Sequence, residues 1–182
     1  MKGKLSYVII AVIAIVLIFQ LFIRLTGGSE GETAPDFSAQ LIDGTDFQLS
    51  DLQGNYVVLD FWGSWCRPCL VENPHLVALH DKYKDQSFVD AEGFKVVTVA
   101  LEKNDNSWQR MAERFGFSWK HQIVEDAAFV VMSPIANEYG VTNIPAKFLI
   151  GPDGTLLMTD QPFSDIDRLL QSKLHLSEHL IH

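Results

Sequence analysis

Residues 56–69 read Tyr-Val-Val-Leu-Asp-Phe-Trp-Gly-Ser-Trp-Cys-Arg-Pro-Cys, and this stretch decides the fold class. From Tyr56 to Trp62 the chain is apolar at odd and even positions alike apart from Asp60, which is typical of a central strand covered on both faces. We expect a helix to follow from about Cys66 towards Tyr83. The stretch therefore predicts a buried strand that leads directly into a helix.

The flanking sequence predicts the other elements of a single α/β domain. Asp43-Gly44 lies between two short segments, 37–42 and 47–49, and predicts an opening β-hairpin. A second β-rich run at 94–101, followed by helical spacing, completes a strand–helix–strand–helix order that predicts parallel pairing. Downstream we expect a helix over about 108–115 that ends at Gly116, a short helix around 135–139, a strand over 147–150, a turn at 152–154 into 155–158, and a last helix with Ile166, Leu169, Leu170 and Leu174 on one stripe.

The chain has 182 residues, and its N-terminal part carries a long hydrophobic stretch. Residues 5–23 include no charged side chain, and as a helix they would cover roughly 30 Å, the thickness of a bilayer core. A cleaved signal peptide has a shorter apolar region that ends in small residues, whereas this one ends Leu-Phe-Ile-Arg-Leu. We therefore predict one N-terminal transmembrane helix.

The predicted domain organisation follows from this anchor. Residues 1–25 form the anchor, residues 26–35 are small and polar and form a flexible tether, and residues 36–182 form one domain. More basic residues precede the span than closely follow it, which places the short N-terminus in the cytoplasm. We expect the domain on the extracytoplasmic, periplasmic side of the cytoplasmic membrane.

The charge of the chain narrows the class of partner. The formal net charge is −9, and every acidic residue follows the hydrophobic stretch. An acidic domain without a basic patch argues against nucleic acid as a partner. Membrane attachment is therefore expected through the N-terminal helix alone.

Cys66 and Cys69 are the two cysteines of the chain, and they lie where the predicted strand gives way to the predicted helix. A helix N-terminus presents unpaired amide groups and a partial positive charge, so it stabilises the thiolate form of Cys66. Cys66 is therefore the expected nucleophile. Cys69, one helical turn on, is placed to resolve a mixed disulfide and to leave a Cys66–Cys69 disulfide.

A structural disulfide and a metal site are the other uses of such a pair. A disulfide that closes so short a loop removes little chain entropy. A tetrahedral zinc site would have to recruit histidines such as His75 or His121, and no second ligand pair has metal-site spacing. We predict no metal site, and we interpret His175 and His179 as part of a polar helix end.

The motif V-L-D-F-W-x-x-W-C-x-P-C resembles the active-site segment of the thioredoxin superfamily. The following Leu70-Val-Glu-Asn-Pro74 and an insertion between Lys95 and Pro134 resemble its membrane-anchored, extracytoplasmic TlpA/ResA-like branch of thiol–disulfide oxidoreductases, whose motif runs W-C-x-P-C-x-x-E-x-P. The resemblance covers the chain from about Ala34 to Leu174. It implies a thioredoxin-like α/β fold, with a central mixed sheet flanked by helices, an N-terminal hairpin and an inserted strand–helix unit.

Asp60 is the next candidate catalytic residue. A carboxylate among apolar strand neighbours loses its hydration unless it is protonated or hydrogen-bonded, so we expect its pKa to be raised. The resemblance implies that the matching acid relays a proton to or from the second cysteine, here Cys69. A raised pKa suits that general acid and base role at neutral pH. The alternative is a strand-edge aspartate that reaches water.

Four further residues are candidates for tuning the site. Glu102 closes the predicted strand 94–101 and, by the resemblance, presents a second carboxylate near the dithiol, with a solvated glutamate as the alternative. Arg67 lies between the cysteines, where a cation favours thiolates, and Pro68 falls in the first helical turn, where its missing amide proton is tolerated. We expect Trp65 to shape an apolar docking rim.

Ile144-Pro145 resembles the cis-proline loop of the superfamily, which faces the dithiol. We expect the backbone of Ile144 to pair with a substrate chain in strand-like fashion. The alternative is a trans proline that merely starts a strand. Ala146 stands where the family usually has threonine, which leaves the details of the substrate contact open.

These residues predict an enzyme that exchanges disulfides with protein substrates and needs no organic cofactor. The resemblance favours the reductive direction, for example in cytochrome c maturation or periplasmic disulfide reduction. A membrane electron-transfer partner would then have to recharge the dithiol, because an oxidising compartment returns it to the disulfide. The alternative is a module that senses redox state or captures a metal without turnover, with His75 as an added ligand.

Overall fold

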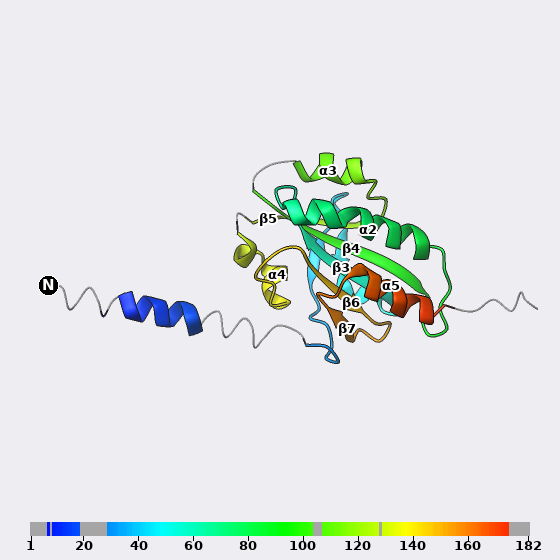
Figure 1. Cartoon of the computed structure of the whole chain (residues 1–182), viewed down its shortest axis with the longest axis horizontal. Coiled ribbons are helices and arrows are strands. Elements are labelled where there is room, and N and C mark those ends of the chain that lie inside the picture. The colour runs from blue at the N-terminus through cyan, green and yellow to red at the C-terminus, as the bar shows by residue number, and fades with distance from the viewer. Residues whose placement is uncertain (1–6, 8, 19–28, 104–106, 128, 175–182) are drawn as a thin grey trace, which may run out of the picture.

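The computed structural model describes residues 7, 9–18, 29–103, 107–127 and 129–174 (Figure 1). Residues 9–18 are helical, and none of the described helices has the length and hydropathy of a membrane span. The predicted span over 5–23 extends at both ends into residues outside this description.

The domain is built around a five-stranded mixed sheet with the order β5-β4-β3-β6-β7. Strands β3 and β4 pair in parallel, as do β4 and β5, whereas β6 is antiparallel to both β3 and β7. The strands are β1 (Ser38–Gln40), β2 (Asp46–Gln48), β3 (Asn55–Trp62), β4 (Gly93–Glu102), β5 (His121–Asp126), β6 (Ala146–Ile150) and β7 (Leu156–Thr159). The helices are η1 (Leu49–Leu52), α2 (Arg67–Tyr83), α3 (Ser107–Phe115), η2 (Val130–Met132), α4 (Pro134–Glu138) and α5 (Phe163–Ser172).

Strand β3 is central because both of its faces are covered. Its residues from Tyr56 to Trp62 are all buried. Odd positions such as Leu59 pack into a core cluster with Phe37, and even positions such as Val58 pack into a second cluster with Leu76 of α2. The continuous apolar run predicted this double coverage, and the structure confirms it.

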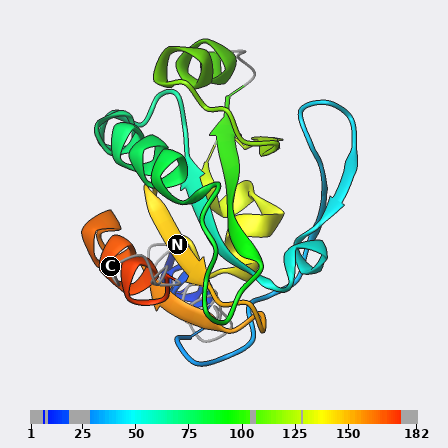
Figure 2. The same cartoon turned by 90° about the vertical axis from the view of Figure 1, so that its right-hand side faces the viewer.

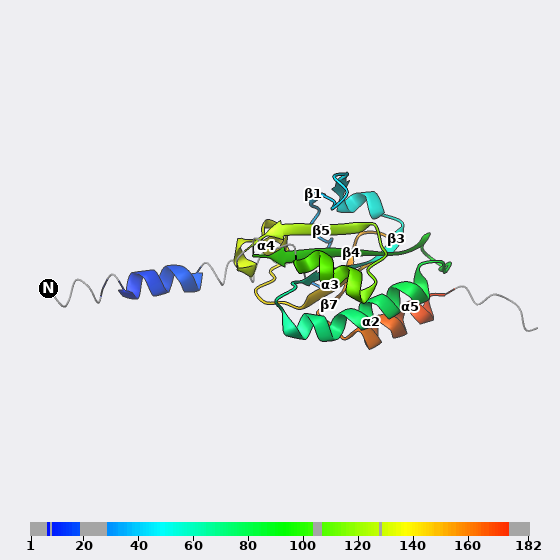
Figure 3. The same cartoon turned by 90° about the horizontal axis from the view of Figure 1, so that it is seen from above.

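The two faces of the sheet are covered by different elements. Helices α2 and α5 lie on one side of the sheet, and β1 and η1 lie on the other (Figure 3). The antiparallel hairpin of β1 and β2 projects on the side away from α2 and α5 (Figure 2). Even-numbered residues of β3 therefore point towards α2 and α5, because successive side chains of a strand point to opposite faces. Asp60 is one of these residues.

The insertion between β4 and α4 contains α3 and the edge strand β5. The helix prediction over about 108–115 is confirmed, and Gly116 ends it with a φ of 79° that favours glycine. The resemblance implies an inserted strand–helix unit, but the residue pattern does not locate β5, because only Ile123 of its six residues is buried. The pairing of β5 with β4 therefore extends the sheet through backbone hydrogen bonds more than through a buried face.

The structure corrects the boundary of the predicted tether. The tether was expected to cover 26–35, but residues from Gly31 on lie along the edge of β7. The backbone N–H groups of Gly31 and Ala34 donate to the carbonyl oxygens of Leu156 and Gly154, each at 2.8 Å, and Leu156 N donates to Glu32 O at 2.8 Å. These small and polar residues are held by their backbones, which leave no side-chain pattern in the sequence.

The corrected boundary can be tested at Ala34, which is buried at 9% exposure. We expect Ala34→Asp to lower the free energy of unfolding by about 1–3 kcal/mol, because it places a charge in an apolar contact. The neighbouring Thr33→Asp, at an exposed side chain, is the matched control and should change it by less than about 0.5 kcal/mol. Urea unfolding measures both free energies. If neither variant changes the free energy of unfolding, the flexible tether extends to residue 35 as first predicted.

Candidate active site

Cys66 and Cys69 form a disulfide at the start of α2, with their Cα atoms 5.3 Å apart. The junction between β3 and α2 places them there. Cys66 is the N-cap of the helix, and its sulfur lies 3.2 Å from the donating backbone N–H of Cys69. A sulfur at this position faces the amide groups that the first helical turn leaves unpaired. The arrangement favours negative charge on Cys66 once the disulfide is opened.

The local sequence explains why the helix begins at this point. Pro68 lies in the first turn, where its missing N–H costs no intrahelical hydrogen bond. Gly63 precedes the motif, and an added Cβ there would lie 3.0 Å from the carbonyl oxygen of Leu101 and 3.0 Å from Nε1 of Trp65. The backbone therefore passes close to the end of β4 before it enters α2.

The loop before β6 faces the dithiol. The Ile144–Pro145 peptide bond is cis, as the resemblance implies. The carbonyl oxygen of Ile144 lies 3.6 Å from Sγ of Cys66. A polypeptide that reaches Cys66 would therefore meet the backbone of Ile144 at the same place.

The rim of the site combines aromatic rings with a lysine. Trp65 is 44% exposed, and its Nε1 donates to the carbonyl oxygen of Leu101 at 2.8 Å. Nζ of Lys103 lies 4.6 Å from the centre of the Trp65 ring and 5.7 Å from the centre of the exposed Phe129 ring. Arg67, which follows Cys66 directly, is also exposed. Trp65 and Arg67 thus place exposed side chains on either side of Cys66 in the chain.

Asp60 is 3% exposed and lies on the α2 face of β3. Burial raises the pKa of Asp60 to about 7, while the charge of Lys147 opposes this rise and the charges of Glu72 and Asp160 add to it. The raised pKa was expected from the apolar neighbours of Asp60 in the sequence. The alternative of an aspartate that reaches water does not agree with its burial.

Lys147 was missed as a site residue. It lies directly opposite Asp60 in the antiparallel pairing of β3 with β6, and it is 4% exposed. Its Nζ lies 2.9 Å from Oε2 of Glu72 and 3.8 Å from Oδ1 of Asp160. The sequence does show a lysine near the start of an otherwise apolar strand, which is unusual. It does not show the strand register, and the register determines which residues lie next to this lysine.

Glu102 is buried at 3% exposure, so the structure corrects the alternative of a solvated glutamate. Its two carboxylate oxygens accept hydrogen bonds from the backbone N–H and the hydroxyl of Ser64, each at 2.7 Å. Ser64 stands two residues before Cys66 and was not singled out in the sequence. The described contacts of Glu102 thus hold the loop that carries the dithiol.

Comparison with known proteins gives the family. Residues 31–158 match the model of the AhpC/TSA family. A thiol-disulfide oxidoreductase ResA from Geobacillus kaustophilus is 32% identical over 175 residues, which cover 94% of this chain and 94% of that protein. The chain belongs to the AhpC/TSA family. This membership and the ResA relatives confirm the predicted enzyme class, a thioredoxin-like thiol–disulfide oxidoreductase.

Solved structures support the same fold. A thiol:disulfide interchange protein DsbE from Chlorobium tepidum superposes with a TM-score of 0.64 at 29% identity, covering 80% of this chain and 95% of that one. A thiol-disulfide oxidoreductase from Bacteroides fragilis gives a TM-score of 0.67 at 24% identity, covering 78% and 98%. The second likeness shows the fold alone. The predicted thioredoxin-like fold with its mixed sheet is confirmed.

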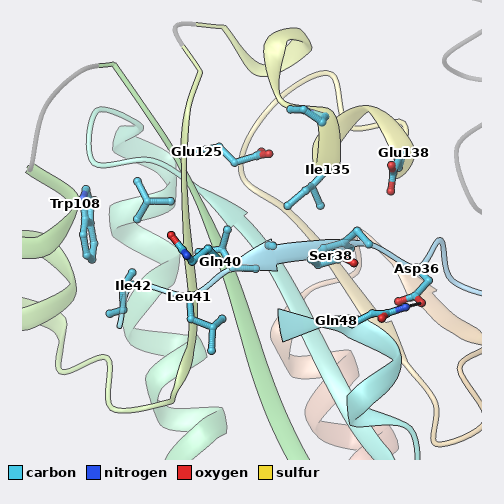
Figure 4. A pocket seen from close by; sticks show the side chains of 15 residues that line it. Asp36, Ser38, Gln40, Leu41, Ile42, Gln48, Trp108, Glu125, Ile135 and Glu138 are labelled. Carbon is cyan, nitrogen blue, oxygen red and sulfur yellow. Dashed lines mark hydrogen bonds between the residues drawn. The ribbon is translucent and has the colours of Figure 1, made fainter. Parts of the chain in front are cut away.

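The oxidoreductase has a cavity beside its N-terminal hairpin. It has a volume of about 630 Å³ and opens between β1, β5 and α4, where Glu125, Ile135 and Glu138 approach it (Figure 4). Neither cysteine lines it. The cavity therefore does not enclose the dithiol, although Trp108 both lines the cavity and packs against the core cluster that contains the two cysteines.

Metal capture by the dithiol, with a histidine as an added ligand, is the alternative to exchange. No group of three or more His, Cys, Asp or Glu side chains there could hold a metal ion. His75 is exposed on α2, and the ring of His121 packs 5.2 Å from that of Phe47. His175 and His179 lie outside the described residues.

The raised pKa of Asp60 makes stability depend on pH. The ordinary value is 3.8 and the folded value about 7, so the folded chain binds more protons between about pH 4 and pH 7 and stability falls as pH rises through that window. We expect Asp60→Asn to be more stable than the parent by on the order of 3 kcal/mol at pH 8, and by little at pH 4.

Urea unfolding of the oxidised chain at both pH values measures this difference. Asp46→Asn, at an exposed aspartate of β2, is the control and should leave the pH dependence unchanged. An Asp60→Asn variant whose stability follows the parent at every pH would show that Asp60 ionises normally in the folded protein.

Proposed function

We propose that the protein is a membrane-anchored, extracytoplasmic enzyme that reduces disulfides of protein substrates. The observation that carries this proposal is the Cys66–Cys69 disulfide at the N-terminus of α2, with Sγ of Cys66 facing the carbonyl oxygen of Ile144 at 3.6 Å. The arrangement supplies a nucleophile, a resolving thiol and a backbone contact for the substrate at one place.

The reaction needs two exchange steps. In the reduced enzyme, the thiolate of Cys66 attacks one sulfur of the substrate disulfide, forms a mixed disulfide and releases the other substrate sulfur, which takes up a proton. Cys69 then loses its proton to the Asp60 carboxylate and attacks Sγ of Cys66. The second substrate sulfur leaves as a thiolate and takes up a proton from water, and the enzyme holds a Cys66–Cys69 disulfide. Two electrons have moved from the enzyme dithiol to the substrate.

The surroundings of Cys66 support a protein as the substrate. Neither cysteine lines the cavity between β1, β5 and α4, and Trp65 and Arg67, which flank Cys66 in the chain, are exposed. The backbone of Ile144 offers an edge to which an extended chain can add. We therefore expect a disulfide to react when its protein can bring it against this exposed surface. The ResA relative is named for the same thiol–disulfide chemistry.

Membrane attachment and direction rest on the sequence. The uncharged stretch over 5–23 is long enough for a bilayer core, and the basic residues before it favour a cytoplasmic N-terminus. An extracytoplasmic dithiol in an oxidising compartment must be recharged with electrons to act as a reductase. We therefore propose a membrane electron-transfer partner that reduces the Cys66–Cys69 disulfide after each turnover.

Trapping a mixed disulfide tests the exchange mechanism. We expect reduced Cys69→Ser to form a covalent complex with insulin, a protein that carries accessible disulfides, because Cys66 can attack but the product cannot be resolved. Reduced Cys66→Ser is the matched control, because the remaining Cys69 does not occupy the N-cap position that favours a thiolate. Non-reducing electrophoresis detects the complex. If neither variant forms the complex, the result favours a sensor without turnover. If only Cys66→Ser forms it, Cys69 is the nucleophile and Cys66 the resolving cysteine.

A reporter cysteine tests the membrane topology of the full chain. In a background that lacks Cys66 and Cys69, we expect a membrane-impermeant maleimide to label Val89→Cys, at a side chain 65% exposed, in intact spheroplasts. Lys2→Cys, at the predicted cytoplasmic end, should react only after lysis. Labelling of Lys2→Cys before lysis, or recovery of the chain in the soluble fraction, would overturn the proposed topology.

A further inference from the structure

A lysine is buried in the core strand next to the candidate relay acid. All five residues of β6 are buried, and four of them are apolar. The fifth, Lys147, has a side chain that is 5% exposed. An ammonium group removed from water is costly unless it is paired, so its partners indicate why the protein retains it.

The register of the sheet joins Lys147 to Asp60. The two residues are Cα partners across β3 and β6, and opposed side chains of neighbouring strands lie on the same face with their Cβ atoms about 5 Å apart. That face is covered by α2 and α5. Nζ of Lys147 also lies 5.2 Å from the centre of the Phe163 ring of α5, which closes this side of the ammonium.

Helix α2 joins the same ammonium to the dithiol. Glu72 lies three residues after Cys69, so the two side chains are neighbours on the helix surface. Oε2 of Glu72 is 2.9 Å from Nζ of Lys147. A continuous set of neighbours thus runs from Cys69 through Glu72 and Lys147 to Asp60.

Asp160 completes the charges around the ammonium. Its Oδ1 lies 3.8 Å from Nζ of Lys147, and its backbone N–H donates to the carbonyl oxygen of Lys147 at 2.7 Å. Asp160 has a φ of 53°, a left-handed conformation that aspartate tolerates better than most residues. The turn after β7 therefore holds a second carboxylate near the lysine.

The ammonium of Lys147 pairs with the carboxylates of Glu72 and Asp160 and lies across the sheet from that of Asp60. The side chains of Glu72 and Asp160 are 38% and 62% exposed, whereas Asp60 is 3% exposed. Asp60 is therefore the carboxyl group of the three that has lost most of its contact with water. Its raised pKa of about 7, lowered by Lys147 and raised by Glu72 and Asp160, agrees with this order. On the β4 side, Thr98 is the Cα partner of Asp60 in the parallel pairing.

We propose that Lys147 is a positioning residue of the exchange reaction, which keeps Asp60 able both to accept and to release the proton of Cys69. The proposal rests on the relay role given to Asp60 under the proposed function. When Cys69 loses its proton to Asp60, the ammonium of Lys147 stabilises the carboxylate before the transfer, and Glu72 limits that stabilisation so that the proton is still accepted. One proton moves from Cys69 to Asp60, and the step needs no other proton transfer.

The two partners of Asp60 should act in opposite directions. Lys147→Met removes the positive charge at similar length, so we expect the titration midpoint of Asp60 to rise by about one pH unit or more. Glu72→Gln removes a negative charge and should lower the midpoint. Lys147→Arg keeps the charge and should stay near the parent. Lys95→Met, at a half-buried lysine of β4 that is not among the charges acting on Asp60, is the control and should not change it.

The midpoint is measured by carbon-13 NMR of the aspartate carboxyl groups in the oxidised full chain in detergent. The Asp60 signal is identified by its absence in Asp60→Asn. A midpoint unchanged in Lys147→Met, equal shifts in Lys147→Met and Lys147→Arg, or shifts of the same sign in Lys147→Met and Glu72→Gln would each overturn the proposal. If Lys147→Met fails to fold, Glu72→Gln and Lys147→Arg decide the matter, because an unchanged midpoint in Glu72→Gln also overturns it.

A second readout separates this proposal from the proposed function. The rate of reduction of the Cys66–Cys69 disulfide by dithiothreitol is compared between variant and parent from about pH 5.5 to pH 8.5, so that the ionisation of the reagent cancels in the ratio. We expect the ratio for Lys147→Met to change with pH as Asp60 titrates. If the Asp60 midpoint shifts but the ratio of reduction rates does not change with pH, Asp60 is not the proton relay and Lys147 has no role in exchange. The dithiol chemistry of the proposed function would be unaffected by this result.

Discussion

The start of α2 at the dithiol is the constraint on which the rest of the structure depends. Cys66 is the N-cap residue of α2, and its sulfur lies 3.2 Å from the backbone nitrogen of Cys69. The helix dipole and the unpaired amides of the first turn then favour negative charge at this sulfur over other places in the chain. β3 holds the junction in place because both of its faces are buried, and Glu102 at the end of β4 fixes Ser64, which leads into the motif.

The buried charges behind the dithiol need a different explanation from the apolar core. A carboxylate and an ammonium taken out of water lose several kcal/mol of hydration each, so such a pair is a weak source of stability. Asp60 and Lys147 nevertheless face each other across β3 and β6, and Glu72 of α2 joins them. The placement suits acid–base chemistry, because a carboxylic acid with a pKa of about 7 can take and return a proton at neutral pH.

The sequence predicts those parts of the protein that depend on local patterns. The apolar run of β3, the Cys-x-x-Cys pair and the hairpin turn at Asp43-Gly44 all carry their signal within a few residues, and the structure confirms the elements they predict. The missed features depend on distant partners. Residues 31–34 are held by backbone hydrogen bonds to β7, β5 has one buried side chain, and Lys147 acquires its meaning from the register of β6 against β3. Neither backbone bonding nor register leaves a pattern in one stretch of sequence.

The equilibrium reduction potential of the Cys66–Cys69 pair tests the central claim most directly. The full chain in detergent is equilibrated with glutathione or dithiothreitol buffers of known potential, the free thiols are trapped by alkylation, and Cys66→Ser shows the signal in the absence of a disulfide. Our account predicts a reducing value near that of thioredoxin, about −270 mV. A value near about −120 mV, typical of strong oxidants, would contradict it and would assign the enzyme to disulfide formation.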